Sequence, residues 1–147
     1  YGALWFASGH AGVARFDGAT WRRFDRTDGL TGDGVYCVTE GPDGVLWFGT
    51  GSGIARFDGA GWRTYTTTDG LPDDAVTSIV VDAAGQPWVG FYRSGVAQFD
   101  GQTWRTYTVE DGLADNHVQA LLADSVGAIW IGGRGGVSRY APAAAQP

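Results

Sequence analysis

The chain has 147 residues, and its ten basic residues, all Arg, are outnumbered by sixteen acidic residues to give a net charge of −6. This balance excludes the basic surface with which proteins neutralise phosphates, so we do not expect a nucleic-acid partner. The 14% aromatic and 44% hydrophobic content supplies enough apolar surface for a packed core, and the length fits one domain.

The sequence lacks the signals of a membrane-spanning or disulfide-linked fold. No apolar run approaches the roughly 18 residues of a membrane span, so we expect no direct membrane insertion. Cys37 is the single cysteine, so no intrachain disulfide can form, and this count fits a reducing or an oxidising compartment. Because the sequence contains no Met, we expect a piece of a longer polypeptide.

A repeat of 41 or 42 residues runs through the chain. Asp-Gly-Leu triplets occur at residues 28–30, 69–71 and 111–113. The seven tryptophans fall on two positions of this repeat: Trp5, Trp47, Trp88 and Trp130 on one, and Trp21, Trp62 and Trp104 on the other.

Each repeat contains four short segments that alternate apolar with polar residues or run apolar, bounded by Gly, Asp or Pro, and this pattern predicts β-strands joined by tight turns. In chain order we name them inner, second, third and outer strands. The chain opens with second, third and outer strands, continues with complete sets at residues 35–65 and 76–107, and closes with inner, second and third strands. The inner strands are the most apolar segments, so we expect them to be the most buried. They lie at residues 35–40, 76–82 and 118–124.

A period of this length with four strands is typical of a β-propeller blade. The predicted fold class is therefore all-β, a β-propeller of four-stranded antiparallel blades with about three and a half repeats. Because propellers typically close with 4 to 8 blades, we expect these strands to be part of a larger ring, and helix to be almost absent. The repeats are placed near residues 2–43, 44–84, 85–126 and, in part, 127–140, followed by an Ala/Pro linker at 141–147.

The pattern V..I..D..G..W.G...G...FDG..W..Y...DGL, read over residues 76–113 and repeated across nearly the whole chain, resembles the two-component regulator propeller repeat. The resemblance implies a bacterial ligand-sensing domain in the periplasm or outside the cell. In that family such domains often form two rings in tandem and feed a membrane histidine kinase or a related signalling output. The resemblance carries no catalytic residue.

The connections between strands divide between two edges of the predicted ring. In an antiparallel meander, the inner–second and third–outer turns lie on one edge, and there the repeats are near copies. The other edge holds the second–third turns and the residues after each triplet, which differ between repeats. We interpret the triplet as scaffold and the residues after it as variable, because an asymmetric ligand on the ring axis needs a different side chain from each blade.

We therefore predict a ligand site on this second edge, for a polar small molecule or an oligosaccharide. Neutral variation of exposed loops is the alternative interpretation. The candidate ligand-binding residues are His10, Tyr92, Arg93 and Arg134 from the second–third turns, and Asp73, Asp74, Asp115, Asn116 and His117 from the segments after the triplets.

Other chemistry finds little support in the sequence. The strict register of the tryptophans favours packing between blades over stacking on sugars. The loop acids offer about two oxygens per loop against the 6 to 8 that Ca²⁺ takes, and neither histidine has further ligands at zinc spacing, so we expect no metal and no cofactor. No nucleophile with its base is evident, so we predict no catalytic residue and no enzyme. Cys37 aligns with Ser78 and Ala120, which indicates a buried small residue.

The predicted function is a non-enzymatic ligand-sensing module, the extracytoplasmic sensor part of a bacterial two-component signalling protein. An interaction propeller that completes its ring with a second copy is the alternative, since two chains of fourteen strands supply 28, although joining the ends duplicates strand types. The expected partners are thus a ligand and the remaining blades of the same or a second chain. A lyase resembling the streptogramin type, with His10 or His117 as base, is the third interpretation.

Overall fold

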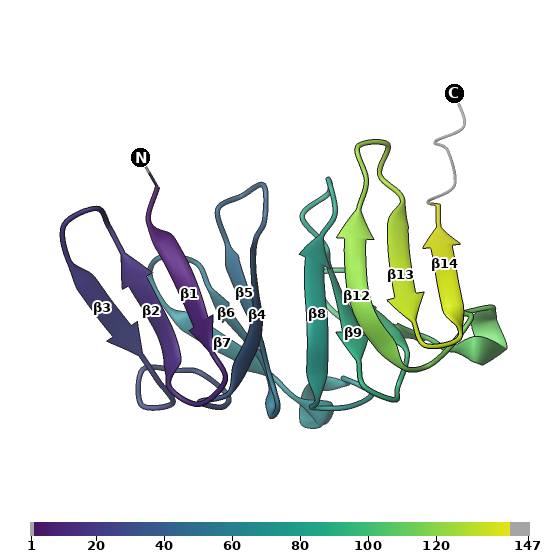
Figure 1. Ribbon diagram of the computed structural model, residues 1–147, viewed down its shortest axis with the longest axis horizontal. Coiled ribbons are helices and arrows are strands. Elements are labelled where there is room, and N and C mark those ends of the chain that lie inside the picture. The colour runs from purple at the N-terminus through teal and green to yellow at the C-terminus, as the bar shows by residue number, and fades with distance from the viewer. Residues whose placement is uncertain (1, 142–147) are drawn as a thin grey trace.

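The computed structural model describes residues 2–141, in which fourteen β-strands form four antiparallel sheets. Figure 1 shows the sheets following one another along the chain. Two short 3-10 helices, η1 (Thr67–Asp69) and η2 (Val109–Asp111), are the helical elements of the described residues. The predicted all-β fold is therefore confirmed, and the predicted linker lies outside the described residues except for Ala141.

Each sheet pairs its strands in chain order. The first sheet contains β1 (Leu4–Ser8), β2 (Gly12–Phe16) and β3 (Trp21–Phe24). The second contains β4 (Val35–Glu40), β5 (Leu46–Thr50), β6 (Gly53–Phe57) and β7 (Trp62–Tyr65). The third contains β8 (Val76–Val81), β9 (Pro87–Phe91), β10 (Val96–Phe99) and β11 (Trp104–Tyr107). The fourth contains β12 (Val118–Ala123), β13 (Ile129–Gly133) and β14 (Gly136–Tyr140).

The four sheets follow one another face against face, and the inner strands of the last three sheets lie at one side of the stack. The inner strands β4, β8 and β12 lie beside one another, and β1 lies next to β4 (Figure 1). The second strands β5 and β9 contact the inner strand of the following sheet. Two complete four-stranded sheets thus lie between two three-stranded ones, in the order that the sequence predicts.

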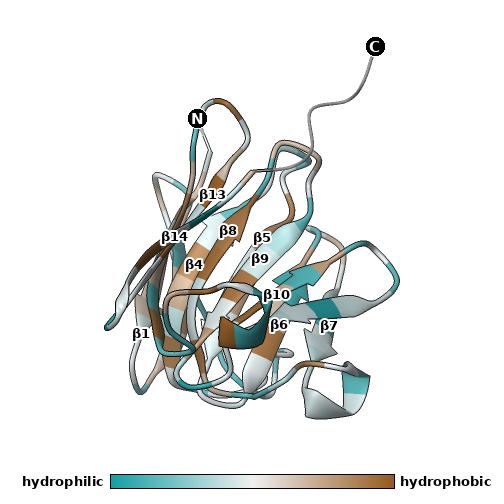
Figure 2. Cartoon of the chain, turned by 90° about the vertical axis from the view of Figure 1, so that its right-hand side faces the viewer, coloured by the Kyte–Doolittle hydropathy of each residue, from teal (hydrophilic) through white to brown (hydrophobic). Residues whose placement is uncertain are grey.

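The second strands are the most buried part of the fold. Every residue of β5 and β9 is buried, whereas β4, β8 and β12 each bury only one or two residues fully. The prediction that the inner strands are the most buried is therefore wrong. An inner strand has one strand neighbour in its sheet and faces the axis, while a second strand lies between two strands and between two sheets. Much of β4 and β8 is nevertheless hydrophobic, as the brown colour in Figure 2 shows.

Tryptophan packing follows the predicted register inside the fold. Trp47 and Trp88 are only 4% and 1% exposed. The prediction is wrong for Trp21 and Trp130, which are 61% and 38% exposed. Each of these two lies on a face of an end sheet that no other described sheet covers. The remaining three, half-buried beside aromatic rings of adjacent sheets, are Trp5, Trp62 and Trp104.

The Asp-Gly-Leu triplets build the connection from one sheet to the next. In the second copy, the Asp69 carboxylate accepts a hydrogen bond from the Thr66 N–H at 2.9 Å, and Thr66 in turn accepts from Thr68 in a capping box. Gly70 has a φ of 102°, which favours glycine. Leu71 is 4% exposed. The third copy repeats the capping box and the positive φ, so the triplet is scaffold, as predicted.

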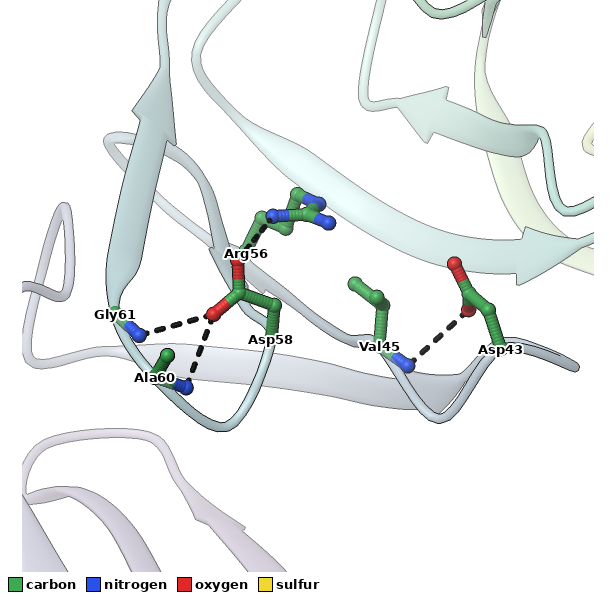
Figure 3. A network of polar contacts seen from close by, with 6 residues as sticks. All are labelled: Asp43, Val45, Arg56, Asp58, Ala60 and Gly61. Carbon is green, nitrogen blue, oxygen red and sulfur yellow. Dashed lines mark hydrogen bonds and ion pairs between the residues drawn. The ribbon is translucent and has the colours of Figure 1, made fainter.

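The near-copied third–outer turns each use one aspartate to hold backbone amides. Asp58 accepts from the N–H groups two and three residues later at 3.0 and 2.9 Å, and from Arg56 at 3.0 Å (Figure 3). Asp17 and Asp100 make the same two amide bonds. These amides, that of Thr20 foremost, lower the pKa of Asp17 from 3.8 to about 2. These acids are therefore structural.

Candidate functional site

The variable edge consists of the second–third turns together with residues 31–34, 72–75 and 114–117, and it forms the lower edge in Figure 1. Backbone hydrogen bonds join each segment after a triplet to the turn of the preceding sheet, and join the first two segments also to the turn of the following sheet. On the side of the following sheet, Gly51 and Tyr92 donate to Gly34 and Ala75 at 3.4 and 3.3 Å. On the side of the preceding sheet, the bonds are Gly12 to Asp33, Gly53 to Asp74 and Gly95 to Asn116, at 2.8, 2.8 and 2.9 Å.

Asp74 and Asn116, two of the predicted ligand-binding residues, hold the scaffold. Asp74 Oδ1 accepts from the first N–H of η1 at 2.8 Å, and Asn116 Oδ1 accepts from the first N–H of η2 at 2.9 Å. In the first repeat, Asp33 Oδ1 accepts from the Arg26 N–H at 3.2 Å. The interpretation that all residues after the triplets are variable is therefore wrong at this position. This position needs a short side chain with an oxygen acceptor in every repeat, and the sequence provides Asp33, Asp74 and Asn116.

Asp73 and Asp115 tie the same segments to the next sheet. Asp73 Oδ2 accepts from Ser94 Oγ at 3.0 Å, and Asp115 Oδ2 accepts from the Gly135 N–H at 2.8 Å. The backbone amide of His117, with that of Gly135, keeps the pKa of Asp115 below its ordinary value. The structure thus gives both carboxylates a role within the loops, and their role in ligand binding stays a prediction.

Tyr92, Arg93 and His117 come together from two different sheets. The Tyr92 and His117 rings lie 4.3 Å apart at 59°, and the Arg93 guanidinium carbon lies 5.4 Å from the Tyr92 ring centre. Arg134 is exposed in the β13–β14 turn, next to the Gly135 amide that Asp115 holds. The structure therefore brings these predicted residues to one end of the variable edge.

His10 lies apart from that cluster. It is exposed in the β1–β2 turn of the first sheet, and its N–H faces Ser8 Oγ at 3.5 Å. Among the described residues, His10 has no hydrogen bond or ring contact with Tyr92, Arg93 or His117, so its role in ligand binding stays a prediction.

Each inner strand has a β-bulge at its second residue, close to the variable edge. The pairing register shifts between Val35 and Cys37, and at the equivalent points of β8 and β12. Bulges are common beside functional sites, where they redirect a side chain. The residues at these bulges are Tyr36, Thr77 and Gln119. Sequence reasoning missed them because they lie within predicted strands, although an aromatic, a hydroxyl and an amide at one repeat position were a visible signal.

Tyr36 and Tyr92 both line a hollow of about 390 Å³. The Tyr36 ring lies over two glycines: a Cβ at Gly34 would be 3.3 Å from its hydroxyl, and one at Gly51 would be 3.5 Å from its Cε2. The Thr77 hydroxyl donates to the Val118 carbonyl at 2.9 Å, which joins β8 to β12 below the hollow. The complete lining is Tyr36, Gly51, Ala75, Val76, Thr77 and Tyr92.

Two further hollows, of about 410 and 400 Å³, lie between adjacent sheets beside the near-copied turns. They occupy equivalent places in the repeat, since each has a second-strand tryptophan, two arginines and an outer-strand aromatic ring. Trp5 and Phe24 belong to one, and Trp47 and Tyr65 to the other. These hollows follow from blade geometry, whereas the hollow at Tyr36 and Tyr92 is built from residues that differ between repeats. We therefore regard the latter as the candidate site.

Cys37 fills an inter-sheet position below the bulge. Burial raises the pKa of its thiol to about 11, although the backbone amides of Gly49 and Ile79 face the sulfur. In the next sheet the Ser78 hydroxyl accepts from the Leu121 N–H at 3.2 Å, so sulfur and oxygen fill the same place. A thiol so far from ionisation is not a nucleophile at neutral pH, which agrees with the predicted buried small residue.

Four chain-ordered antiparallel sheets around adjacent inner strands, with aromatic rings packed between them, define the blades of a β-propeller. The family model of the two component regulator propeller matches the chain at residues 29–52 and 112–135. The resemblance predicted from the sequence is thereby confirmed. Each matched segment runs from a triplet through an inner strand to the following second–third turn.

Solved structures of longer proteins contain the same fold. An extracellular domain assigned to a hybrid two component system of B. thetaiotaomicron aligns over 97% of this chain and 20% of its own, with a TM-score of 0.85 and 20% identity. An extracellular domain assigned to a one component system of the same organism aligns over 94% of this chain and 22% of its own, with a TM-score of 0.71 and 21% identity. This chain therefore spans about a fifth of the length of both domains.

An enzyme also shares the fold. Virginiamycin B lyase from Staphylococcus aureus aligns over 97% of this chain and 53% of its own, with a TM-score of 0.74 and 19% identity. At these identities the likeness shows the fold alone. No curated protein sequence matches the chain.

None of the helices in residues 2–141 has the length and hydrophobicity of a membrane span. Within the same residues, no group of three or more His, Cys, Asp or Glu side chains is placed to hold a metal ion.

Proposed function

We propose that the chain is a non-enzymatic recognition module that binds a polar ligand, most simply an oligosaccharide, at the hollow between Tyr36 and Tyr92. We further propose that it serves as the extracytoplasmic sensor part of a bacterial two-component signalling protein. The family match and the two extracellular domains of similar fold support this setting.

One observation carries the proposal: side chains that differ between repeats gather around one hollow. Tyr36 and Thr77 stand at equivalent bulges, and Tyr92 replaces the Gly51 of the preceding blade. Tyr36 and Tyr92 are 60% and 46% exposed, so both rings are accessible to a ligand. A hollow of about 390 Å³ lies within the range of small-ligand sites.

The chemistry of the walls favours a sugar. Aromatic rings offer flat apolar faces, against which the C–H face of a pyranose can stack, and the tyrosine hydroxyls can exchange hydrogen bonds with its hydroxyl groups. The apolar floor is supplied by Ala75 and Val76. Arg93 and His117 lie beside the Tyr92 ring, outside the lining of the hollow, where they can bind a carboxylate or further hydroxyl groups of a longer ligand.

Isothermal titration calorimetry with cellohexaose and with a galacturonate hexamer tests the proposal with a neutral and an acidic probe. Removing an aromatic wall by Tyr36→Ala or Tyr92→Ala should raise the Kd for the probe by about 5- to 30-fold, the equivalent of about 1–2 kcal/mol. Trp21→Ala is the matched control, because it removes an equally exposed ring beside the near-copied turns. Affinity that is unchanged in both tyrosine variants, or absence of binding of either probe, would contradict the site.

The same titrations separate recognition from catalysis. The recovered probe should keep its length and its glycosidic bonds, which mass spectrometry of the mixture reports. If the probe is shortened or gains a double bond, the module is an enzyme. His117→Ala then tests whether the imidazole packed on Tyr92 acts as the base.

A further inference from the structure

The hollow at Tyr36 and Tyr92 has a counterpart one repeat further along the chain. In the second, third and fourth sheets, the first residue of the inner strand pairs with the last residue of the second strand. The bulge residue and the first turn residue that follow this pairing are therefore equivalent in the three sheets. They are Tyr36 and Gly51, Thr77 and Tyr92, and Gln119 and Arg134. Moving the lining of the hollow by one repeat gives the counterpart, which consists of Thr77, Tyr92, His117, Val118, Gln119 and Arg134.

Contacts between the third and fourth sheets join the members of this counterpart. The Tyr92 and His117 rings lie 4.3 Å apart at 59°. The Thr77 hydroxyl donates to the Val118 carbonyl at 2.9 Å. The counterpart is therefore formed where two neighbouring sheets meet at the variable edge, as the hollow is.

The counterpart differs from the hollow in shape. In the hollow, two of the repeat positions hold Gly51 and Ala75, which leave the space open. In the counterpart, the rings of Tyr92 and His117 stand at these positions and pack on each other. The counterpart is therefore a platform beside the hollow, and Tyr92 belongs to both.

The outer end of the platform carries an amide and a guanidinium group. Gln119 and Arg134 are both exposed, and they stand at the positions where the hollow has Thr77 and Tyr92. The platform therefore presents hydrogen-bonding groups and a positive charge where the hollow presents a hydroxyl group and an aromatic ring.

The acid of the neighbouring loop leaves the arginine available. Asp115 accepts from the His117 N–H at 2.9 Å with one oxygen and from the Gly135 N–H at 2.8 Å with the other. Neither of the two ion pairs found within residues 2–141 involves Arg134. Its guanidinium group can therefore pair with an anionic group of a ligand.

We infer that the platform is a second subsite, which binds an acidic sugar unit next to the unit held in the hollow. This inference rests on the proposed function, because it needs a ligand in the hollow. Tyr92 separates the two units, since it belongs to both positions. A planar guanidinium matches a carboxylate through two parallel hydrogen bonds, and an amide exchanges hydrogen bonds with sugar hydroxyl groups. The ligand class is thus an oligosaccharide with a uronate unit, lying across the second, third and fourth sheets.

Isothermal titration calorimetry with trigalacturonate and with its methyl ester tests the second subsite, because only the first probe carries charged carboxylates. The wild-type chain should bind the acidic trimer about 10-fold more tightly than the ester. Arg134→Gln should remove this preference by raising the Kd for the acidic trimer about 10-fold and leaving that for the ester unchanged. Gln119→Ala should raise the Kd for both trimers by about 2- to 10-fold, because both keep their hydroxyl groups.

Arg105→Gln is the matched control. It removes the same charge from the outer strand β11, where the Arg105 guanidinium carbon lies 4.9 Å from the Tyr107 ring centre, outside both subsites. The Kd for each trimer should stay at the wild-type value in this variant. Far-ultraviolet circular dichroism and a thermal melt confirm that every variant is folded.

The possible outcomes separate this inference from the proposed function. If Tyr36→Ala weakens both trimers while Arg134→Gln changes neither, the ligand occupies the hollow and the second subsite is refuted alone. Equal losses in Arg134→Gln and Arg105→Gln would show that net charge sets the preference, which also overturns the subsite. Absence of binding of both trimers contradicts the proposed function, and the second subsite with it.

Discussion

Gly29 and Gly112 offer a matched test of how the Asp-Gly-Leu turns support the blades. Both have positive φ, 132° and 104°, so alanine at either position is strained in the backbone. A Cβ at Gly29 would also lie 2.5 Å from Trp62 Cβ, whereas one at Gly112 would meet no atom within 4 Å. The strain should cost about 1–2 kcal/mol in both variants. The overlap with Trp62 should add about 1–3 kcal/mol in Gly29→Ala alone.

Thermal unfolding followed by circular dichroism, at one fixed protein concentration, measures the difference. For a chain of this size each kcal/mol corresponds to about 2–4 °C in Tm. Gly112→Ala should therefore lower the Tm by about 2–8 °C, and Gly29→Ala by about 4–20 °C. Equal losses in the two variants would refute the argument that Gly29 makes room for Trp62, the outer-strand tryptophan of the next blade.

Three further predictions follow from individual contacts. Burial raises the pKa of Cys37 to about 11. Its reaction with Ellman's reagent at pH 8 should therefore be about 100-fold slower in the folded chain than in the urea-unfolded chain. Similar rates in the two states would show an accessible thiolate. Amide hydrogen bonds lower the pKa of Asp17 from 3.8 to about 2, so the stability that they add is present above pH 3.8 and is lost as the pH falls through about 2. The Asp17→Asn variant should be less stable than wild type in urea at pH 7, and the difference should shrink as the pH falls from 3.8 towards 2. A difference that stays constant would contradict this origin. Thr77→Val removes the donor to the Val118 carbonyl between β8 and β12 and should cost about 1 kcal/mol in urea unfolding, whereas no loss would mean that this bond is not stabilising.

The order of the strands could be predicted from the sequence because it depends on periodic features. Glycine and aspartate mark the turns, and they recur where backbone conformation demands them, as at Gly70 and Asp69. Burial could not be predicted in the same way. The apolar composition of β4 suggested a buried strand, but accessibility depends on what packs against each face, and β4 faces the axis.

The candidate site could be predicted only in part. The position of Tyr92, Arg93 and His117 on one edge follows from counting turns in a meander, and the structure brings the three together. Tyr36 was missed because a bulge depends on the pairing of two strands, which the alternation within one strand does not report. Conversely, Asp74 differed from Asn116 in the sequence, although both accept the same hydrogen bond.

Strand pairing in this fold never leaves the local stretch of chain: the ladder of the second sheet is complete within residues 35–65 and that of the third within residues 76–107. A gene duplication or deletion of one 41- or 42-residue unit therefore cuts no hydrogen-bonded ladder. Such an event changes only the number of blades in the ring. Blade number in this architecture can consequently drift by whole units during evolution, while each unit keeps its own backbone pairing.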